Sequence, residues 1–416
     1  MPEIQPNLLV FSSLFPSSAQ PNAGLFIRER MFRVGKKIPV SVVSPVPWFP
    51  LLGLIRIFKP GYRPMPPRQE SQQGITVYYP RFFSLPVIGR AFDGFFMALG
   101  ARRLVLKLRD SQGINLIDSH FAYPDGYAAT KLGNWLNLPV TITLRGTEVP
   151  HAKDKIKCKK MLVALNNAAR IFAVADSLKQ HMVSLGATKE KIRVVGNGVD
   201  TAKFHPVSQL DSRKALGISA QAKVMISVGG LTERKGFHRV IECLPELKKT
   251  HPELLFIIIG GASGEGDWGA KLKQMVEQMG LSDTVRFLGT LPPESLYQPL
   301  SAADLFVLAT RNEGWANVFL EAMACGLPVV TTNVGGNAEV VNSEQLGSIV
   351  PFEDKAALTV AIDNALNKTW DHEIIRGYAC ANEWGLRVKI LEQEFQEIVT
   401  NFYGQGGEPT GKHSSI

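Results

Sequence analysis

Short apolar runs of four to seven residues alternate with amphipathic stretches along the whole chain. Such runs, separated by helical patterns, favour parallel sheets, because parallel strands need a crossover connection that is usually a helix. Helices are predicted between the runs, for example over 236–249 and 268–280. We therefore predict α/β architecture with two series of strands. The first series covers 7–13, 40–45, 75–80, 114–119, 140–144, 170–175 and 192–197, and the second covers 224–229, 254–260, 284–289, 305–309 and 329–332.

The segment 197–208 separates the two series, because it carries turn residues and a proline. A chain of 416 residues is also too long for one ordinary core and suits two domains. We predict an N-terminal domain over 1–200 and a C-terminal domain over 206–385. A helical pattern over 385–404 follows the second sheet, and the polar stretch 405–416, rich in Gly and Ser, is expected to be disordered.

The composition is that of a globular protein, with 45% hydrophobic and 20% charged residues. We find no apolar run long enough to span a bilayer and no secretory signal at the start of the chain. The four cysteines lie far apart without metal-ligand spacing, which suits a reducing compartment. The expected location is the cytoplasm.

Charge is distributed unevenly between the halves of the chain. Residues 1–205 carry 28 Lys and Arg against 12 Asp and Glu, whereas residues 206–416 carry 18 against 25. A basic half suggests nucleic acid, an anionic membrane or an anionic substrate as a partner, and the alternative is charge tuned for solubility. Neither half has G-x-G-x-x-G after its first strand, and no P-loop motif occurs, which counts against dinucleotide dehydrogenases and P-loop enzymes.

Chemically unusual residues follow the predicted strands. In open parallel sheets, ligands bind beyond the carboxyl ends of the strands, so these positions are candidates for a site. The residues are Gly24, His120, Arg145, Glu148, Gly229, Gly230, Arg234, Lys235, the glycine-rich loop 260–266, Glu313 and Gly314.

The stretch "VGGLTERKGF" (228–237) predicts a phosphate or diphosphate cradle. Its glycines let backbone N–H groups approach an anion, the following helix adds positive partial charge, and Arg234 and Lys235 add full charges. The alternative is a glycine turn with two solvated cations.

The stretch "RNEGWANVFLEAMACGLPVV" (311–330) points to ligand binding more strongly. A helix is predicted to begin near Asn317 and to end at Gly326. Glu313 in the preceding loop could accept hydrogen bonds from sugar hydroxyls, and Glu321 in the helix could accept them from a ribose diol. The alternative, two ordinary surface charges, fits this succession of strand, Glu-Gly turn, helix and Gly-Leu-Pro poorly.

At these residues the sequence resembles the family-4 retaining glycosyltransferases of GT-B fold. The match is the E-x7-E signature from Glu313 to Glu321, supported by "RVVGNGVDTAKFHP", "VGGLTERKGFHRVI", "VRFLGTLPPESL" and "NAGLFIRER". The N-terminal half looks most like bacterial surface-polysaccharide transferases, including those of the teichuronic-acid type. The resemblance implies two Rossmann-like domains whose parallel sheets face each other across a cleft. It also implies a final helix, from about residue 386, that packs back on the N-terminal domain.

The resemblance implies a hexosyltransferase with a nucleotide-sugar donor held by the C-terminal domain and a glycan or lipid-linked acceptor held by the N-terminal one. Lys235 and Arg234 would hold the donor diphosphate, Glu321 the ribose, and Glu313 the transferred sugar. The implied catalytic residues are His120, Glu313 and Lys235, and Arg145 and Glu148 are candidates for the acceptor. The implied donor-binding residues are Gly24, Gly229, Gly230, Arg234, Lys235, Gly261, Leu288, Glu313, Gly314, Trp315, Ala316, Asn317, Val318 and Glu321.

The chain departs from the family pattern at three places. Family members often have Gly-Arg where this chain has Gly229-Gly230, so one cation is missing unless Arg234 replaces it. The common "GFPN" or "GFGL" is "GWAN" here, so Trp315 could reshape sugar selectivity. Arg145 stands in a segment that elsewhere often carries histidine.

No D-x-D motif occurs, so the charge of the leaving group would be stabilised by Arg234, Lys235 and helix N-termini. We therefore expect no cofactor and no metal. The resemblance implies front-face attack with retention, in which the departing diphosphate takes the acceptor proton.

The basic half could dock on the anionic inner face of the plasma membrane, where a lipid-linked acceptor would lie. The segment 47–68 mixes apolar residues with Arg and Lys, and 153–160 carries five lysines, although a solvated face would look the same. Rival functions are a nucleotide-sugar epimerase, a phosphorylase-like enzyme, a catalytically silent binding module and a basic nucleic-acid-binding protein. The last lacks zinc spacing and an aromatic-basic RNP run, so no nucleic acid is expected.

Overall fold

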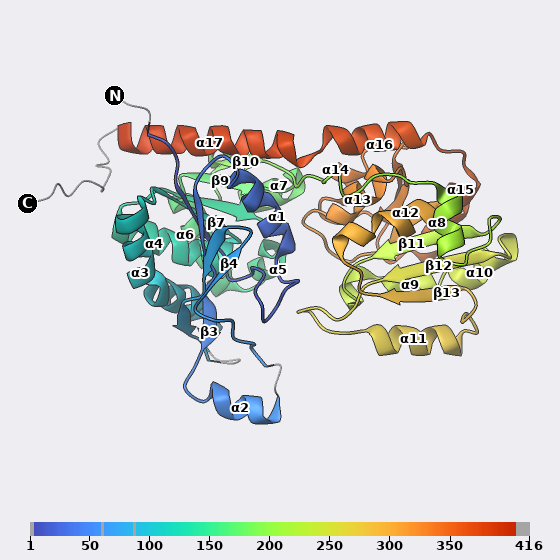
Figure 1. The fold of residues 1–416 in the computed structure, drawn as a ribbon, viewed down its shortest axis with the longest axis horizontal. Coiled ribbons are helices and arrows are strands. Elements are labelled where there is room, and N and C mark those ends of the chain that lie inside the picture. The colour runs from blue at the N-terminus through green and yellow to red at the C-terminus, as the bar shows by residue number, and fades with distance from the viewer. Residues whose placement is uncertain (1–3, 60–61, 86–88, 405–416) are drawn as a thin grey trace, which may run out of the picture. The chain divides into compact units, whose positions relative to one another are not determined.

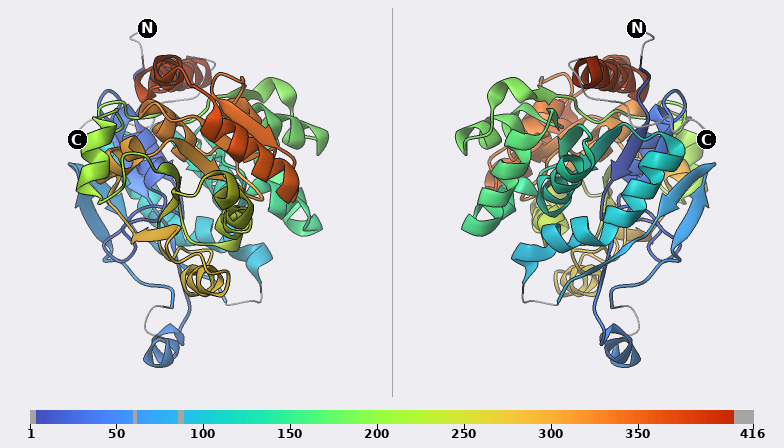
Figure 2. Two further views of the ribbon diagram at one scale, coloured as in Figure 1. Left: turned by 90° about the vertical axis from the view of Figure 1, so that its right-hand side faces the viewer. Right: turned by 90° about the vertical axis from the view of Figure 1, so that its left-hand side faces the viewer.

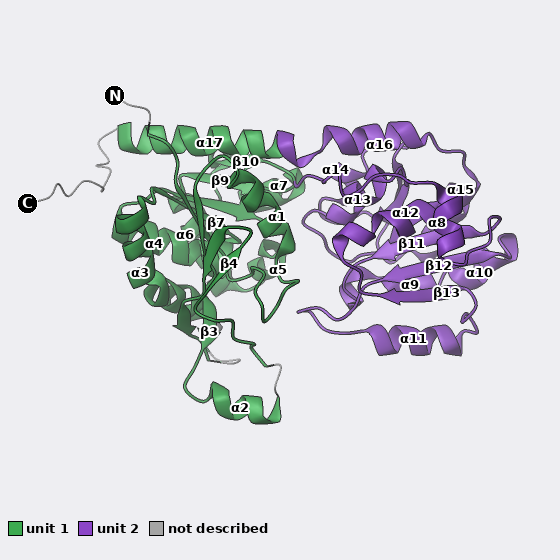
Figure 3. Ribbon diagram, in the orientation of Figure 1, with its two compact units in different colours: residues 1–196, 387–416 green, residues 197–386 purple. Residues whose placement is uncertain are grey.

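The computed structural model describes residues 4–59, 62–85 and 89–404, so the predicted tail 405–416 lies outside the described residues. The chain forms two compact units (Figure 3). Unit 1 comprises residues 1–196 and 387–416, and unit 2 comprises residues 197–386. Each unit has its own sheet and its own buried core, which confirms the predicted α/β class with two parallel-sheet domains.

Within its described residues, unit 1 is built on an eight-stranded sheet in the order β10-β9-β8-β7-β1-β2-β5-β4. Neighbours are parallel except β4 and β5, which pair antiparallel. The chain builds from β1 to β2 and β5 and then returns to the other side of β1 with β7. The point where the strand order reverses therefore lies between β1 and β7. The strands are β1 (Leu8–Phe11), β2 (Val40–Val43), β4 (Gln69–Gln72), β5 (Ile75–Tyr78), β7 (Leu116–His120), β8 (Val140–Leu144), β9 (Arg170–Ala173) and β10 (Ile192–Val194).

Helices connect the parallel strands of unit 1, as the sequence pattern predicts (Figure 1). The first begins directly after Gly24. The helices are α1 (Leu25–Val34), α3 (Asp93–Gln112), α4 (Tyr127–Leu136), α5 (Glu148–Ala152), α6 (Lys155–Asn167) and α7 (Asp176–Ser184).

One excursion leaves the body of unit 1 between β2 and α3. Its two ends pair as a small parallel sheet of β3 (Val46–Trp48) and β6 (Arg81–Phe83). Helix α2 (Leu52–Phe58) lies in this excursion and stands apart from the main sheet of its unit in every view (Figures 1 and 2).

Unit 2 has, within its described residues, a six-stranded all-parallel sheet in the order β13-β12-β11-β14-β15-β16. This is the doubly wound Rossmann order, and the strand order reverses between β11 and β14. The strands are β11 (Lys223–Val228), β12 (Leu254–Ile259), β13 (Val285–Gly289), β14 (Leu305–Leu308), β15 (Val329–Thr332) and β16 (Gly347–Val350).

The helix predicted over 236–249 is wrong as a single element, because it forms as two short helices. Pro245 lacks an N–H group, and its ring would clash with the carbonyl of Ile241 in a continuous helix. The chain therefore stops α9 at Ile241 and starts again at Leu244. The helices of unit 2 are α8 (Gln209–Ala215), α9 (Phe237–Ile241), α10 (Leu244–Thr250), α11 (Gly269–Gln278), α12 (Tyr297–Ala302), α13 (Asn317–Ala324), α14 (Asn337–Val340), α15 (Lys355–Asn367) and α16 (His372–Ala381).

The last helix, α17 (Trp384–Gly404), starts at the end of unit 2 and belongs mostly to unit 1. Its apolar side chains recur at helical spacing and join the core of unit 1. Phe395 packs edge-on against Phe172, with ring centroids 5.8 Å apart. The buried Glu394 forms ion pairs with Arg170 and Arg193.

None of the helices in the described part of the chain is long and apolar enough to cross a membrane.

Candidate functional site

The loops that leave β11 and β14 meet at the reversal point of the unit 2 sheet, where Rossmann folds bind their ligands. Gly236 makes the contact possible. Its φ is +74°, and a Cβ at this position would lie 1.8 Å from the carbonyl oxygen of Ala309. Both the positive φ and this contact exclude a side chain at position 236. The close approach of Gly236 to Ala309 holds the preceding residue, Lys235, beside Glu313.

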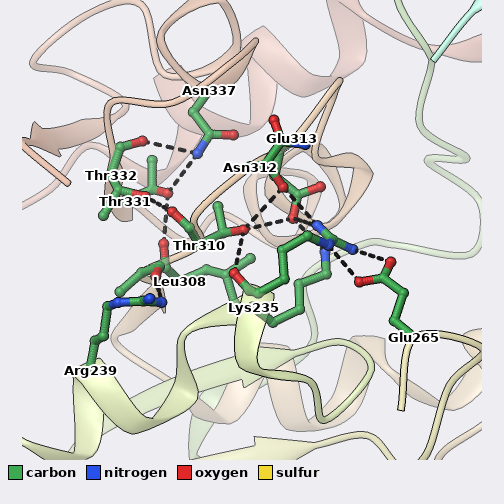
Figure 4. A network of polar contacts seen from close by, with 12 residues as sticks. Lys235, Arg239, Glu265, Leu308, Thr310, Asn312, Glu313, Thr331, Thr332 and Asn337 are labelled. Atoms are coloured by element: carbon green, nitrogen blue, oxygen red, sulfur yellow. Dashed lines mark hydrogen bonds and ion pairs between the residues drawn. The ribbon is translucent and has the colours of Figure 1, made fainter. Parts of the chain in front are cut away.

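Glu313 is the centre of a polar network at this point (Figure 4). Lys235 Nζ lies 2.7 Å and Arg234 Nη1 lies 3.0 Å from Glu313 Oε1. The Thr310 hydroxyl donates to the same oxygen at 3.1 Å. Only 9% of the Glu313 side chain is exposed. Its carboxylate is held by two cations where the loops after β11 and β14 meet.

The same contacts explain the protonation state of Glu313. Burial alone would raise the pKa of its carboxyl group. The charges of Lys235 and Arg234, with hydrogen bonds from Lys235 and Thr310, outweigh burial and hold the pKa below its ordinary value. Glu313 is therefore a carboxylate at neutral pH and can only accept hydrogen bonds.

Arg234 is bound on its other side by Glu265, from the loop after β12. The two form a bidentate pair, with Nε–Oε2 at 2.7 Å and Nη2–Oε1 at 2.8 Å. Arg234 also donates to the carbonyl of Asn312 at 2.7 Å. Lys235, by contrast, has three donors and uses one of them on Glu313. Lys235 therefore has more donor capacity left for a ligand than Arg234 has.

Helix α13 begins at Asn317 and its last residue precedes Cys325, close to the predicted limits. Asn197 fixes the start of this helix, because its amide donates to the Asn317 side chain at 2.9 Å. Trp315 packs against the core of unit 2, and its buried Nε1 has no hydrogen-bond partner among the described residues. Glu321 lies one turn into α13 and is half-buried.

Two residues that the sequence reasoning missed, Gly335 and Asn337, lie after β15 and pack beside the loop that carries Glu313. Gly335 has a φ of +51°, and a Cβ there would lie 1.8 Å from the Glu313 carbonyl oxygen. Asn337 is fully buried and donates to Thr331 and Thr332, at 3.2 and 3.0 Å. Both lie in the stretch "NVGGNAEVV" (333–341), directly after the strand predicted over 329–332, and this position was the signal that could have found them.

The predicted donor-binding residues of unit 2 all lie on or just after four adjacent strands, at their carboxyl edge. Gly229, Gly230, Arg234 and Lys235 follow β11, Gly261 follows β12, Leu288 lies in β13, and Glu313, Gly314, Trp315, Ala316, Asn317, Val318 and Glu321 follow β14. Among them, the structure brings Arg234, Lys235 and Glu313 into direct contact.

The remaining predicted residues belong to unit 1. His120, at the end of β7, is fully buried. Arg145 Nε donates to His120 Nδ1 at 3.2 Å, which leaves the proton of the neutral ring on Nε2. That nitrogen lies 3.5 Å from Asp118 and has no hydrogen-bond partner among the described residues. Burial, and then the charges of Arg145 and Arg30, lower the pKa of His120 well below its ordinary value.

Glu148 is also fully buried, and its contacts explain why. Its carboxylate accepts backbone N–H groups from Ala122, Arg145 and Gly146, at 3.0, 3.1 and 2.8 Å. These bonds fasten the loop after β8 to the loop after β7. Glu148 and Arg145, the candidates for the acceptor, are therefore buried in this structure and bond to other groups of unit 1.

Gly24 and Phe121 mark two tight points of the unit 1 backbone. Gly24 has a φ of +67°, and a Cβ there would lie 2.4 Å from the carbonyl oxygen of Leu14. Phe121, directly after His120, has a φ of +71°, which is unusual for a residue with a side chain. Such strain clusters at functional sites.

The described residues contain no group of three or more His, Cys, Asp or Glu arranged to hold a metal ion. Independence of metals stays a prediction.

The fold places the protein in a known class. A structure of Anabaena Alr3699/HepE in complex with UDP superposes with a TM-score of 0.72 at 18% identity, covering 94% of this chain and 100% of that one. The sucrose-phosphate synthase of Thermosynechococcus elongatus gives a TM-score of 0.72 at 20% identity, covering 97% and 99%. The protein has the GT-B glycosyltransferase fold, as predicted.

Sequence comparison gives the family. Residues 208–379 match the glycosyl transferases group 1 and residues 55–203 match glycosyltransferase family 4. The D-inositol 3-phosphate glycosyltransferase of Corynebacterium urealyticum is 34% identical over 313 residues, or 69% of this chain and 72% of that protein. The chain belongs to the family-4 glycosyltransferases, and it is a glycosyltransferase.

A further relative agrees with the predicted resemblance to surface-polysaccharide enzymes. The candidate teichuronic acid biosynthesis glycosyltransferase TuaC of Bacillus subtilis is 27% identical over 402 residues, covering 94% of this chain and 98% of that protein. Of the functions that the sequence left open, family membership supports the transferase over the epimerase, the phosphorylase-like enzyme, the silent module and the nucleic-acid-binding protein.

Proposed function

We propose that the protein transfers a sugar from a nucleotide-sugar donor to a lipid-linked or cell-surface polysaccharide acceptor, with retention of configuration and without a metal. The observation that carries this proposal is the contact of Lys235 and Arg234 with Glu313 at the reversal point of the unit 2 sheet. Support for the donor comes from HepE, a protein of the same fold whose structure contains UDP.

In this proposal Lys235 binds the donor diphosphate. Its free donors and its charge suit phosphate oxygens, and the glycines after β11 let backbone N–H groups approach the same anion. As the bond to the sugar breaks, negative charge grows on the diphosphate, and a fixed cation stabilises that charge without reorganisation. Arg234 contributes to the same anion once its bidentate contact with Glu265 opens.

Glu313 binds hydroxyl groups of the transferred sugar. A nucleophilic carboxylate must approach the anomeric carbon closely, as in retaining glycosidases. Glu313 is instead buried against two cations that hold it away from such a role. This supports front-face attack by the acceptor hydroxyl, whose proton passes to the departing diphosphate. The anomeric configuration of the product, determined by NMR, tests retention.

Glu321 binds the donor ribose, and Trp315 lies beside the transferred sugar, where its unpartnered Nε1 can donate to a hydroxyl. His120, proposed as a catalytic residue from the sequence, fits a positioning role better, because its buried ring holds Arg145 and reaches no solvent. His120→Ala should lower kcat more than it raises the KM of the donor, and His120→Asn should restore part of the loss.

Peripheral contact with the inner membrane face completes the proposal. The basic half of the chain and the exposed apolar side chains of α2 support it. Co-sedimentation with anionic vesicles should weaken as salt rises, and absent or salt-insensitive binding would contradict this part.

A thermal-shift panel of UDP-, GDP- and ADP-sugars tests the donor site. One nucleotide class should raise the melting temperature, and Glu321→Gln and Lys235→Gln should each reduce that shift. Lys249→Gln is the matched control, because it removes a cation whose ion pair is exposed on α10. A folded protein that responds to no donor would contradict the proposal.

A further inference from the structure

Two adjoining cavities in unit 2 are lined by none of the residues that the sequence predicts to bind the donor. One has a volume of about 330 Å³ and lies between α9 and α11. The other has a volume of about 260 Å³ and is lined by α9, α15 and the carboxyl ends of β14 and β15. His238 and Glu242 line both cavities, which therefore form one groove beside α9. Helices α9 and α11 contact each other along it (Figure 1).

We propose that this groove, called the α9 groove below, is a second carbohydrate site that binds a neutral oligosaccharide. The inference goes beyond the proposed function, because the groove retains a glycan and takes no part in the transfer of the sugar. Three features carry it: an aromatic and apolar lining, polar groups with unused hydrogen-bonding capacity, and a balance of charge.

The first feature is the apolar lining of the larger cavity, which Trp268, Leu272 and Met275 supply. Leu272 is buried and the other two pack against the core of unit 2, so this lining is fixed in position. The ammonium group of Lys271 lies 3.8 Å from the centroid of the Trp268 ring, on a side chain that is exposed and free to move aside. An indole face that attracts an ammonium group also attracts the C–H groups of a sugar ring, since their hydrogens carry partial positive charge.

The second feature begins with the polar side chains of α11. Lys271, Gln274 and Gln278 are spaced by three and four residues and therefore lie on one side of the helix. Both glutamines are exposed, and their side-chain amides make no hydrogen bond within the described part of the chain. Each amide has two donor hydrogens and an acceptor oxygen, so this side of α11 can bond several hydroxyl groups.

Glu242 adds an acceptor on the opposite side of the larger cavity, directly after α9. It is half-buried, yet its carboxylate has neither a hydrogen-bond partner nor an ion-pair partner among the described residues. A carboxylate in this position has lost part of its hydration without compensation, which favours a ligand that donates to it. A sugar hydroxyl can donate to Glu242 and accept from a glutamine amide at the same time.

The third feature is the balance of charge. The two cavities together are lined by three cations and three carboxylates: Arg239, Lys271, Lys355, Glu242, Glu353 and Asp354. Arg239 is already paired with Glu233 at 2.9 Å. His238 adds no charge at neutral pH, because burial, and then the charge of Arg239, lower the pKa of its imidazole to about 4. The groove therefore has no excess of positive charge to attract a phosphate or a carboxylate.

Together these features select the class of ligand. An anionic ligand would meet the unpaired carboxylate of Glu242, and a hydrocarbon chain would leave the amides of Gln274 and Gln278 without partners. A neutral sugar chain matches both the apolar and the polar part of the lining. The two volumes lie near the lower end for small-molecule sites, about 300 Å³, and their adjacency favours linked sugar rings over a single one.

The test is affinity electrophoresis of the full chain in native gels that each contain one polysaccharide. Dextran, mannan, galactan and arabinoxylan are the neutral probes, and polygalacturonate is the acidic one. At least one neutral polysaccharide should slow the wild type. Gln278→Ala and Glu242→Ala should each weaken that binding about 3- to 10-fold, because each removes a hydrogen bond to the glycan. Gln221→Ala and Glu246→Ala, at exposed positions of unit 2 outside the groove, are the matched controls and should change nothing.

The absence of retardation by all four neutral polysaccharides, or equal retardation of wild type and both groove variants, would overturn the proposal. Retardation by polygalacturonate that is lost in the groove variants would overturn the neutral class of ligand, whereas acidic binding through the basic half of the chain should be the same in all variants.

Nucleotide binding is titrated on the same samples and should be equal in wild type and groove variants. Glycan binding that is lost only together with nucleotide binding would contradict a separate site. A wild type that binds a neutral glycan but no nucleotide would support the groove and count against the proposed function.

Discussion

The two sheets reverse their strand order at equivalent points, yet the titratable side chains there differ in exposure. In unit 2 the side chains of Arg234, Lys235 and Glu313 are 25%, 15% and 9% exposed. In unit 1 the side chains of His120 and Asp118 are 0% and 1% exposed. The first group can meet a ligand, and the second is closed inside the protein.

The difference in exposure corresponds to a difference in bonding. In unit 2 Lys235 keeps unused donors, and Arg234 is paired with a carboxylate, Glu265, that is itself 52% exposed. In unit 1 Glu148 has backbone N–H partners on both carboxylate oxygens. In the proposed function, the charges at the reversal point of unit 2 bind the donor, whereas Glu148 in unit 1 holds the loops of its own unit.

The largest expected effect is a loss of activity when a charge of the unit 2 group is removed. Lys235→Gln should lower the rate of sugar transfer about 100- to 1,000-fold, because it removes the fixed cation that faces the developing charge. The initial rate with saturating donor measures this. Lys249→Gln should leave the rate unchanged. A similar loss of rate in both variants would contradict a specific role of Lys235 in the reaction.

The next effect is a loss of stability when a buried charge of unit 1 is removed. Glu148→Ala should lower the free energy of unfolding by about 3 kcal/mol or more, because it leaves buried N–H groups without acceptors. Urea denaturation measures the change, and Glu148→Gln, which keeps one acceptor oxygen, should lose less. Glu246→Ala on exposed α10 should change stability by no more than about 0.5 kcal/mol. If Glu148→Ala were as mild, the structural role of Glu148 would be wrong.

A pH effect of intermediate size comes from Asp125, which accepts from the Ser13 backbone and hydroxyl. Burial raises its pKa to about 7. The unfolded chain releases this proton near pH 3.9, so between about pH 4 and 7 the folded state binds more protons and its stability falls as pH rises. Asp125→Asn removes this loss. The stability difference between variant and wild type should therefore shift in favour of the variant, by about 1 kcal/mol per pH unit between pH 5 and 6.5.

Urea denaturation of both proteins at several pH values measures that difference. Other titrating groups, His120 and Asp118 included, contribute equally to the stability of variant and wild type, so their contributions cancel in the difference. A difference that stays constant across the range would contradict a raised pKa for Asp125.

The smallest effect concerns the pair of Arg234 with Glu265. Glu265→Gln should strengthen nucleotide binding about 2- to 5-fold, because it weakens an exposed ion pair that holds Arg234 away from the diphosphate. Calorimetric titration measures the affinity, with Glu246→Gln as control. Weaker binding in Glu265→Gln would mean that Glu265 supports the ligand instead.

The sequence allowed much of the fold to be predicted, because apolar runs mark buried strands. The runs at 140–144 and 329–332 coincide with β8 and β15. Strand β4, with the sequence QESQ, was missed since an exposed edge strand has no apolar run. Strand β16 was missed because its sequence, GSIV, begins with glycine and serine and has only two apolar residues.

The site was predictable as far as it depends on position along the chain. Lys235 and Glu313 follow adjacent strands, so their contact agrees with the expected edge of the sheet. The loop 260–266 was expected at this edge, but the pairing of its Glu265 with Arg234 and the contact of Asn197 with Asn317 depend on tertiary structure. The burial of Arg145 and Glu148 was hidden for the same reason, because a polar residue after a strand can turn inward as well as outward.

One measurement tests the central claim, that the unit 2 cations bind the donor without a metal. UDP, GDP and ADP are titrated calorimetrically into wild type and Lys235→Gln, in excess EDTA. We expect one nucleotide to bind wild type under these conditions and to bind the variant at least about 10-fold more weakly. Binding that requires an added divalent ion, or that is equal in the two proteins, would contradict the account.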